Sequence, residues 1–584
     1  MYRITMIMVV LIAIVAESVV CQNIELIGKQ KAIVINGGLG FNYSSTITND
    51  SNRIAMPAFW STNLNLNIDI YGFVIPISAV LTNGKVNLVN SFSQFGMSPH
   101  YKWITLHAGY RQYSYSPFTV GGQTFFGGGI ELHPWLFRLG FFTGQLHKAV
   151  AVDSLSLLSK QSIPGSYPTN ITTVNGTNYY SSQPAYARTA WGAKFGFGTD
   201  RNFVDLIVFK GQDIASSLTD AASKLKLLPE ENLVLGLNCF QRFGKHISFA
   251  FNGAASIYTY NTDVAPITGE LPAAIPLKGV LNELIVIRPT TQLQWAGDVS
   301  LGLNFKNFSL QTQYKHIEPY FKSMGIGSFL SDLEMITIQP SWSLFKQKIR
   351  FTNMLQLQHD NINNYRQYTT SRLLINSSVS FNLSNNWGFD VSYNNYDMTQ
   401  KKQLASATDS TQSHQLSNTY TFSPRYIFNN STFTDVVSVV GSFTDMDGGK
   451  QSNGTSNRIE NFYSTINNTL ALFKSTWSIN AGLNYNDAKT ALNDLLSYGF
   501  IAGVSKSLFE NKLGLSYNNT LLWNMLDGKP NGNTYSIDLT GTYCLFKKHN
   551  LGLAFNYLFS PANGVYNTRD FQQKRITFSY QYNF

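Results

Sequence analysis

The sequence predicts an all-β protein, a closed antiparallel transmembrane β-barrel of about 24 strands within a range of about 18–26. Three observations lead to this prediction. Apolar and polar residues alternate along most of the chain, short and long gaps alternate between the alternating segments, and the composition is rich in aromatic residues and poor in charge. Together they indicate strands with one face in lipid and one in a polar interior.

The composition favours strands and argues against an ordinary soluble protein. The chain has 584 residues, of which 14% are aromatic and 13% are charged. That charged share is about half the usual value for soluble domains, and Phe, Tyr and Thr favour strands. The net charge of +10 is modest and no run of like charges occurs, so no nucleic-acid partner is predicted. Downstream of residue 21 no apolar run reaches the roughly 18 residues of a membrane helix.

The alternation is clear in residues 291–305. Trp295 and Leu301 fall on one face of an extended chain, whereas Asp298 and Ser300 fall on the other, because successive side chains of a strand point to opposite sides. Such segments, about 9–13 residues long, recur from residue 33 onward and match tilted strands that cross a bilayer. We therefore assign 33–584 to the barrel.

The gaps between segments predict the orientation. Short gaps repeat a motif of Leu, Phe and a basic or amide residue, seen in "LFKQK" (344–348), "LFENK" (508–512) and "LFKKH" (545–549). Outer-membrane barrels have short periplasmic turns and longer outer loops. We therefore expect these motifs and both chain ends in the periplasm, with the Phe rings at the membrane boundary.

The N-terminus predicts export. Residues 1–21 have the basic start and short apolar core of a signal peptide, and 22–32 would form a short periplasmic N-terminus. The alternative is that Cys21 is retained and lipidated, against which Val20 argues. Cys239 and Cys544 are too few for a disulfide scaffold or a zinc site, and no cofactor is expected.

The C-terminus closes on an alternating aromatic strand. Phe578, Tyr580, Tyr582 and Phe584 share one face. A terminal Phe in this setting resembles the assembly signal of outer-membrane barrels, so we expect the barrel-assembly machinery and outer-membrane lipid as partners.

Three segments carry a resemblance to a known group. They are "FSQFGMSPHYKWITLHAGYRQYSYSPFTVGGQTFFGGGIEL" (92–132), "LPEENLVLGL" (228–237) and "YKHIEPYFKSMG" (314–325). They resemble outer-membrane β-barrel proteins of the Bacteroidota. The resemblance implies the outer membrane of a Gram-negative cell, and it supplies no activity and no functional residue.

Several segments interrupt the pattern. Residues 73–100 and 262–289 are expected as inserts in the lumen or at the rim, and 262–289 contains an apolar stretch that a free loop would not carry. Residues 151–186 are expected to form an outer loop. Residues 213–228 have a helix start and helical spacing of apolar residues.

Eight ionisable residues fall on faces predicted to point inward, and they are candidate lumen-lining residues: Arg111, Glu131, Arg138, Lys194, Asp205, Asp298, Lys315 and Arg350. Charges lining a pore set its selectivity. The alternative is that they pair with one another and fill a polar interior.

The functional prediction is a pore or transport channel for small or oligomeric solutes. The alternative is a non-conducting scaffold or a partner subunit of another cell-envelope complex. A TonB-dependent transporter is not expected, because only 22–32 separate the predicted signal peptide from the first strand, too few for a plug domain. No catalytic or metal-binding spacing appears in the sequence, so no enzyme is predicted.

Overall fold

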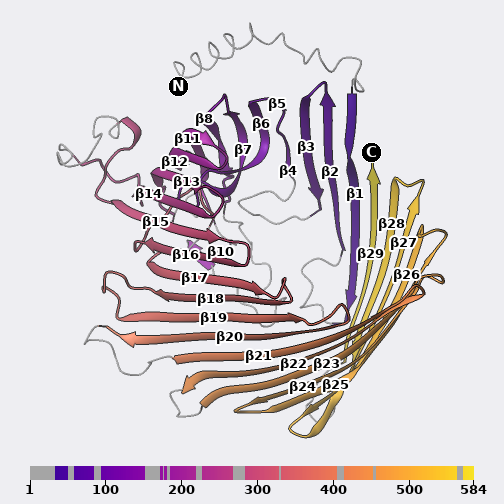
Figure 1. Cartoon of the computed structure of the whole chain (residues 1–584). Helices are drawn as coiled ribbons and strands as arrows, with labels where there is room; N and C mark the ends of the chain where they lie inside the picture. Colours follow the sequence, from indigo (N-terminus) through magenta and orange to yellow (C-terminus); the bar gives the residue numbers. More distant parts are fainter. Residues whose placement is uncertain are drawn as a thin grey trace.

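The structure is a computed structural model that describes residues 33–49, 58–83, 94–151, 171–174, 177–180, 184–218, 227–267, 283–327, 330–403, 414–450, 456–561 and 570–584. The predicted signal peptide, the segment 22–32 and Cys21 lie outside the described residues. Within them the chain forms one large sheet that closes on itself, as predicted (Figure 1).

The first part of the wall is built from strands in chain order, apart from one small hairpin. The strands are β1 (Ile33–Thr48), β2 (Ala58–Ile70), β3 (Phe73–Thr82), β4 (Gln94–Met97), β5 (His100–Tyr101), β6 (Ile104–Ser114), β7 (Gly121–Leu132), β8 (Phe137–His147), β11 (Ala187–Thr199), β12 (Asn202–Ile214), β13 (Glu231–Phe243), β14 (Ile247–Thr259), β15 (Thr291–Asn304), β16 (Phe308–Ile317) and β17 (Leu333–Leu344). The separate hairpin is β9 (Ile171–Val174) with β10 (Thr177–Tyr180).

The rest of the wall continues in the same way. Its strands are β18 (Ile349–His359), β19 (Tyr368–Asn382), β20 (Trp387–Lys402), β21 (His414–Asn429), β22 (Phe433–Lys450), β23 (Ser456–Leu472), β24 (Trp477–Thr490), β25 (Asp494–Leu508), β26 (Leu513–Leu526), β27 (Lys529–Leu545), β28 (His549–Ser560) and β29 (Phe571–Asn583).

The ring closes between the first and last strands. β1 pairs antiparallel with β29 from Gly38↔Asn583 to Thr48↔Gln573, and the two lie side by side in Figure 1. The sheet contains 27 strands, but β4 and β5 share one place between β3 and β6, so the barrel has 26 strand positions. The even number places both ends of the wall at the same end of the barrel. The predicted fold class is confirmed.

The wall has an apolar outer face and a polar inner face. Trp295 and Leu301 are 55% and 42% exposed and face outward, whereas Asp298, on the opposite face of the same strand, is 5% exposed. Rows of exposed apolar side chains on neighbouring strands continue this outer face, among them Phe195, Leu206, Leu293, Leu483 and Leu553. A closed barrel leaves no unpaired strand edge in lipid, and the apolar rows face the hydrocarbon.

The two ends of the barrel differ in their connections. At one end the strands are joined by turns of two to four residues, which we call the short-turn rim: 71–72, 102–103, 133–136, 200–201, 244–246, 305–307, 345–348, 383–386, 430–432, 473–476, 509–512 and 546–548. The loop end carries the longer connections, but 491–493 and 527–528 are also short there, because β24 to β27 are long strands that extend almost to each other at this end.

The expected insert over 73–100 is replaced in the structure by wall strands. Phe73–Thr82 is β3 and pairs with β2 over ten residues, and Gln94–Met97 and His100–Tyr101 complete the next strand position. Alternation is blurred in β3, because Val74, Pro76 and Val80 break what would be its polar row. These are the two strand positions that the sequence pattern does not reveal.

The other interruptions lie at the loop end. Of 262–289, residues 268–282 are outside the described part. The described Ile285 packs on Leu233 and Ile257, which pair in register with the outward-facing Leu293, so this part lies against the outer face and not in the lumen. The helix expected over 213–228 is wrong at its start, because β12 continues to Ile214 and only Ala215–Ser217 forms a short 3-10 helix, η3. Most of 151–186 lies outside the described residues.

Candidate functional site

Two loops from the loop end fold into the barrel. They are residues 115–121, which run from the end of β6 to the first residue of β7, and residues 318–327, between β16 and β17. We call them the inner loop pair. Thr119 and Val120 are 0% and 2% exposed, and the Asn238 side chain, which lies on the inner face, donates a hydrogen bond to the carbonyl of Tyr115 over 3.0 Å. The first loop therefore reaches well down the inside of the wall.

Backbone and side-chain hydrogen bonds join the two loops. Ser323 Oγ donates to the carbonyl of Thr119 over 2.7 Å, and the amide of Gly121 donates to the carbonyl of Gly325 over 3.0 Å. A side chain at Gly236 on the wall would collide with Thr119, because a Cβ atom at this position would lie 2.3 Å from the Thr119 methyl group. The absence of a side chain at Gly236 lets the loop approach the wall.

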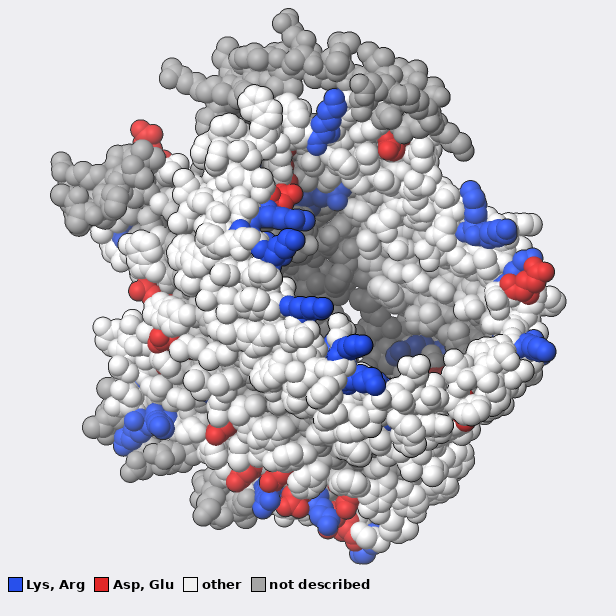
Figure 2. Space-filling model, in the orientation of Figure 1, with Lys and Arg blue, Asp and Glu red and all other residues white. Residues whose placement is uncertain are grey.

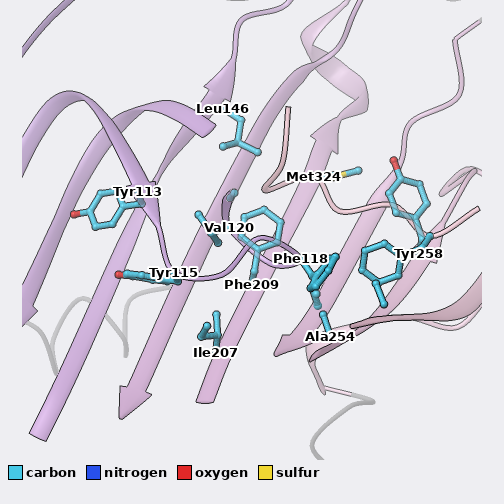
Figure 3. Close-up of a cluster of buried hydrophobic side chains, with 14 of the residues drawn as sticks. Tyr113, Tyr115, Phe118, Val120, Leu146, Ile207, Phe209, Ala254, Tyr258 and Met324 are labelled. Carbon is cyan, nitrogen blue, oxygen red and sulfur yellow. The ribbon is translucent and has the colours of Figure 1, made fainter. Parts of the chain in front are cut away.

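An apolar cluster fills the space between the inner loop pair and the wall (Figure 3). Phe118 and Val120 come from the loop, and Phe209, Ala254 and Tyr258 from the wall, and all are at most 5% exposed. Burying a large apolar side chain contributes about 1.5–3 kcal/mol. The loop pair is therefore packed like a protein core and is not a loose surface loop.

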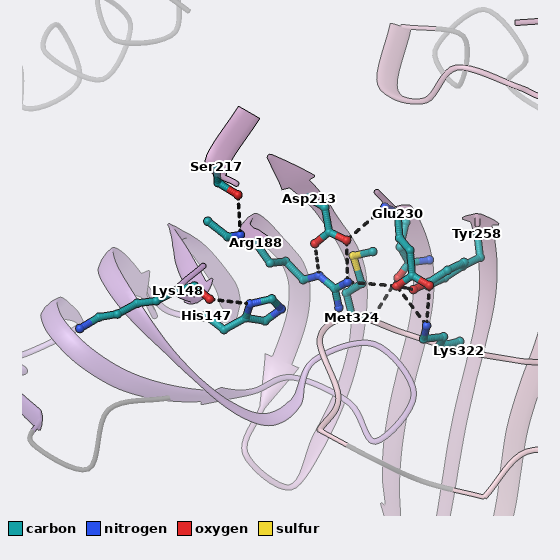
Figure 4. A network of polar contacts seen from close by, with 11 residues as sticks. His147, Lys148, Arg188, Asp213, Ser217, Glu230, Tyr258, Lys322 and Met324 are labelled. Atoms are coloured by element: carbon teal, nitrogen blue, oxygen red, sulfur yellow. Dashed lines mark hydrogen bonds and ion pairs between the residues drawn. The ribbon is translucent and has the colours of Figure 1, made fainter. Parts of the chain in front are cut away.

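A chain of ionic contacts fixes the second loop at the loop end (Figure 4). Arg188 donates to Asp213 over 2.7 and 2.9 Å and to Glu230 over 3.0 Å. Lys322 of the inner loop pair reaches the same Glu230 carboxylate at 3.0 Å, and Tyr258 donates its hydroxyl hydrogen to Glu230 over 2.5 Å. Glu230 thus links wall strands β11 and β14 to the loop.

Two further contacts position the loop backbone. The amide of Met324 donates to Asn232 Oδ1 over 3.0 Å, and Ser256 Oγ donates to the carbonyl of Lys322 over 2.6 Å. The Asn232 and Ser256 side chains are fully buried. Buried polar groups left without partners are costly, so these contacts specify one loop position.

The eight candidate lumen-lining residues lie on the face opposite the exposed apolar rows. The structure brings several of them together. Arg138 pairs with Asp205 at 3.0 Å, the Lys194 ammonium lies 4.7 Å from the centre of the Tyr115 ring, and Lys194 is within electrostatic reach of Glu131 and Asp205. Lys194 thus connects this group of charges to Tyr115 of the inner loop pair.

The others are spread around the wall. Arg111 lies in β6 and donates to Ser78 in β3 over 3.3 Å. Asp298 accepts a hydrogen bond from Asn252 over 2.9 Å and stands opposite Lys315 in the strand register. Arg350, on β18, stands opposite a serine on each neighbouring strand. The eight do not form one ring.

The inner face of β18 to β29 has a different character. It presents Ser, Thr, Asn and Gln in cross-strand pairs, such as Thr419 with Thr444 at 3.0 Å and Ser497 with Asn524 at 2.7 Å. Asn394 on this face is exposed. Neither of the two buried apolar clusters of the described residues includes a residue of these strands.

A recess of about 680 Å³ marks the boundary between these two inner surfaces. Its lining comes from β13 to β20 and combines two kinds of side chain. Many carry hydroxyl or amide groups, among them Ser248, Ser300, Ser309, Gln311, Gln339, Ser341, Thr352, Asn376, Ser378, Ser392 and Asn394, and others are apolar, among them Phe240, Leu303, Leu310, Pro340 and Met354. Such a surface offers both donors and acceptors to a polar solute.

The residues that anchor the inner loop pair were missed from sequence. A signal for them exists, because the three segments that resemble Bacteroidota barrels meet here: 92–132 contains the first loop, 228–237 contains Glu230 and Asn232, and 314–325 contains Lys322. No groups of three or more His, Cys, Asp or Glu side chains suited to a metal ion occur among the described residues.

Comparison with known proteins identifies no family. No known protein family and no curated protein sequence matches the chain. Among solved structures, the ferric yersiniabactin uptake receptor FyuA from Yersinia pestis is 10% identical with a TM-score of 0.39, covering 95% of this chain and 81% of that chain. The FrpB iron transporter from Neisseria meningitidis is 10% identical with a TM-score of 0.36, covering 97% and 83%. The P pilus usher (PapC) translocation pore is 10% identical with a TM-score of 0.37, covering 94% and 99%.

The architecture defines the class of protein. Among the described helices none is long and apolar enough to cross a membrane. The 26 strand positions form a closed ring with an apolar exterior and a polar interior. The chain is a multi-pass β-barrel of the outer membrane.

Proposed function

We propose that this protein is an outer-membrane pore for polar solutes, with its path along the inner face of β18 to β29. The observation that carries the proposal is that this face is lined by uncharged polar side chains, in a barrel wide enough to hold the inner loop pair on its other side. Barrels of 16–18 strands already leave an aqueous channel, so about 26 strands enclose a larger space.

The lining supports selectivity for size and polarity over charge. Charged groups on this inner face are sparse, and Arg425 and Asp390 neutralise each other at 2.9 Å. The recess lined by Ser, Thr, Asn and Gln offers neutral hydrogen bonds to a solute. Anchored loops inside a barrel narrow its lumen, and the inner loop pair would set the size limit.

The test is single-channel conductance of the purified full-length barrel in planar bilayers. The proposal predicts steady, ohmic steps that scale with salt concentration and show weak preference between cations and anions. A folded barrel, identified by its heat-modifiable migration in gels, that gives no steps would contradict the proposal.

A second candidate is the non-conducting scaffold, and the packed inner loop pair favours it. A barrel that is plugged from within needs contacts that hold the plug against the inner wall. The bonds of Lys322 to Glu230 and of Met324 to Asn232 hold the inner loop pair in this way. Solute-swelling of liposomes separates the candidates, because a scaffold admits no sugar of any size, whereas a pore admits sugars up to a size limit.

A further inference from the structure

The short-turn rim is strongly basic. Its twelve turns contain ten Lys or Arg residues and two acidic residues. The basic residues are Lys102, Arg201, Lys245, Lys306, Lys346, Lys348, Lys474, Lys512, Lys547 and Lys548, and the acidic residues are Asp200 and Glu510. Asp200 is already paired with Arg138 at 3.1 Å. In Figure 2, Lys and Arg side chains are spaced around the central hollow with few Asp or Glu among them.

Exposed Phe side chains stand beside these charges. Phe345, Phe509 and Phe546 are 72%, 68% and 81% exposed. Each adopts a left-handed backbone conformation, with φ of 52°, 52° and 51°, which is unusual for a bulky residue. The same turn is therefore built three times to hold an aromatic ring out from the wall.

The rings continue the lipid-facing surface. Each of these Phe residues follows a Leu that ends the outer apolar row of its strand, namely Leu344, Leu508 and Leu545. A large apolar side chain held in water is unfavourable, whereas an aromatic ring at the edge of the hydrocarbon is favourable. This placement favours membrane over water as the surroundings of the rim.

A basic residue on the outer face adds an independent observation. Lys506 faces outward near the short-turn rim, and its ammonium lies 4.5 Å from the centre of the Trp477 ring. A Lys side chain often lies along the apolar surface of a membrane protein and extends its ammonium group to the membrane–water interface, where Trp is also common. The Lys506–Trp477 contact is therefore typical of the depth of the lipid headgroups.

We propose that the short-turn rim binds anionic phospholipid headgroups of the membrane leaflet that surrounds it. The lysines would contact headgroup phosphates, while Phe345, Phe509 and Phe546 enter the edge of the hydrocarbon. A basic residue near an anionic surface contributes about 1 kcal/mol of attraction in such systems. This inference rests on the barrel's place in the membrane and does not depend on whether the lumen conducts.

The experiment measures lipid preference around the full-length barrel. The barrel is placed in phosphatidylcholine vesicles containing brominated phosphatidylglycerol or brominated phosphatidylcholine, and quenching of tryptophan fluorescence gives the relative binding constant. Trp342, Trp387 and Trp477 report on this rim, because each lies at the short-turn end of its strand. The proposal predicts binding of phosphatidylglycerol about three- to tenfold tighter than phosphatidylcholine, declining as salt rises.

Lysine-to-glutamine variants test whether the rim lysines cause the preference for phosphatidylglycerol. Changing Lys346, Lys348, Lys547 and Lys548 together to Gln should bring the ratio close to one. The matched control changes four lysines at the loop end, Lys401, Lys489, Lys529 and Lys574, to Gln and should leave the ratio unchanged. A wild-type barrel without preference, or a preference that survives the rim variant, would overturn the proposal.

A third arm distinguishes an acidic protein partner. A polyglutamate peptide is titrated onto the barrel in phosphatidylcholine vesicles at physiological salt. Peptide binding that requires the rim lysines, without any preference for phosphatidylglycerol, would assign the rim to an acidic periplasmic protein and overturn the lipid proposal.

Discussion

The inner wall of the barrel has two sides that were built differently. From β6 to β17 the part toward the loop end is covered by the inner loop pair, with fully buried Asn232, Ser256 and Tyr258 beneath. From β18 to β29 it presents cross-strand polar pairs such as Thr419 with Thr444, and Asn394 is exposed. We call these the filled side and the open side. The same alternation of side chains thus produces a packed core on one side and a solvent-facing lining on the other, depending only on what folds against it.

The largest expected difference comes from removing one carboxylate on each side. Glu230→Ala on the filled side removes a partner of Arg188, whose side chain is 18% exposed, and the acceptor of the buried Tyr258 hydroxyl. Leaving such a group without its partner costs about 1–3 kcal/mol for each group. Asp390→Ala on the open side breaks a pair with Arg425 whose side chains are 43% and 37% exposed, and such pairs contribute less than about 1 kcal/mol. The free energy of unfolding in lipid vesicles measures both.

The effect of these two substitutions can also be measured locally, by hydrogen exchange in the second loop of the inner loop pair. Hydrogen exchange should rise at 318–327 in the Glu230→Ala variant and stay unchanged there in Asp390→Ala. Equal losses of stability in the two variants would mean that the filled side is not a packed core.

The second prediction is that the outer faces of the two sides are alike. Leu301→Arg on the filled side and Leu483→Arg on the open side should each cost about 2–4 kcal/mol, because both place a charge in lipid. Leu301 and Leu483 are 42% and 61% exposed and lie on outward rows. Ser300→Arg, on the inner face next to Leu301, serves as the control and should cost less.

Accessibility separates this membrane barrel from a soluble one. A spin label at residue 301 or 483 should collide with oxygen in the bilayer and be shielded from water-soluble relaxants. A label shielded from both would show that these rows are a protein core.

The third prediction is a pH response confined to the filled side. Burial raises the pKa of Glu230, but the hydrogen bond from Tyr258 and the charge of Lys322 outweigh it, so the pKa lies below its ordinary value. A lowered folded-state pKa stabilises the folded state above the unfolded pKa of about 4.3, and this contribution is lost as pH falls through the folded pKa. Exchange at 318–327 should therefore rise below about pH 4, while the open side changes less. Glu230→Gln should remove the difference.

Most strands of the wall can be predicted from the sequence, because the alternation of apolar and polar residues within each strand shows which face is outward and which is inward. The two strand positions that the sequence did not predict are β3 and the β4–β5 pair. In β3 apolar residues occupy both faces, and the β4–β5 position is divided into two short strands. Pro76 in β3 further weakened the signal, since proline is unusual inside a sheet.

The candidate site could be predicted only in part. Inward orientation of Asp205, Asp298 and Lys315 follows from local alternation. The meeting of Glu230 with Lys322 does not, because 92 positions separate them and only the folded loops bring them together. Whether the eight candidates line a conducting path stays a prediction, as does the assembly role of Phe578, Tyr580, Tyr582 and Phe584, which lie in or at the end of β29. The Bacteroidota origin likewise rests on the resemblance alone.

The central claim, that the open side is the path and the filled side is not, is tested most directly by blocking single channels from within. Cysteines are placed at Asn394 on the open side and at Ala254, 5% exposed on the filled side, in a background with Cys239 and Cys544 changed to Ser. A bulky cationic thiol reagent should lower the conductance of the Asn394→Cys channel in discrete steps and leave the Ala254→Cys channel unchanged. Block at residue 254 but not at 394, or a folded barrel that conducts in neither variant, would contradict the account.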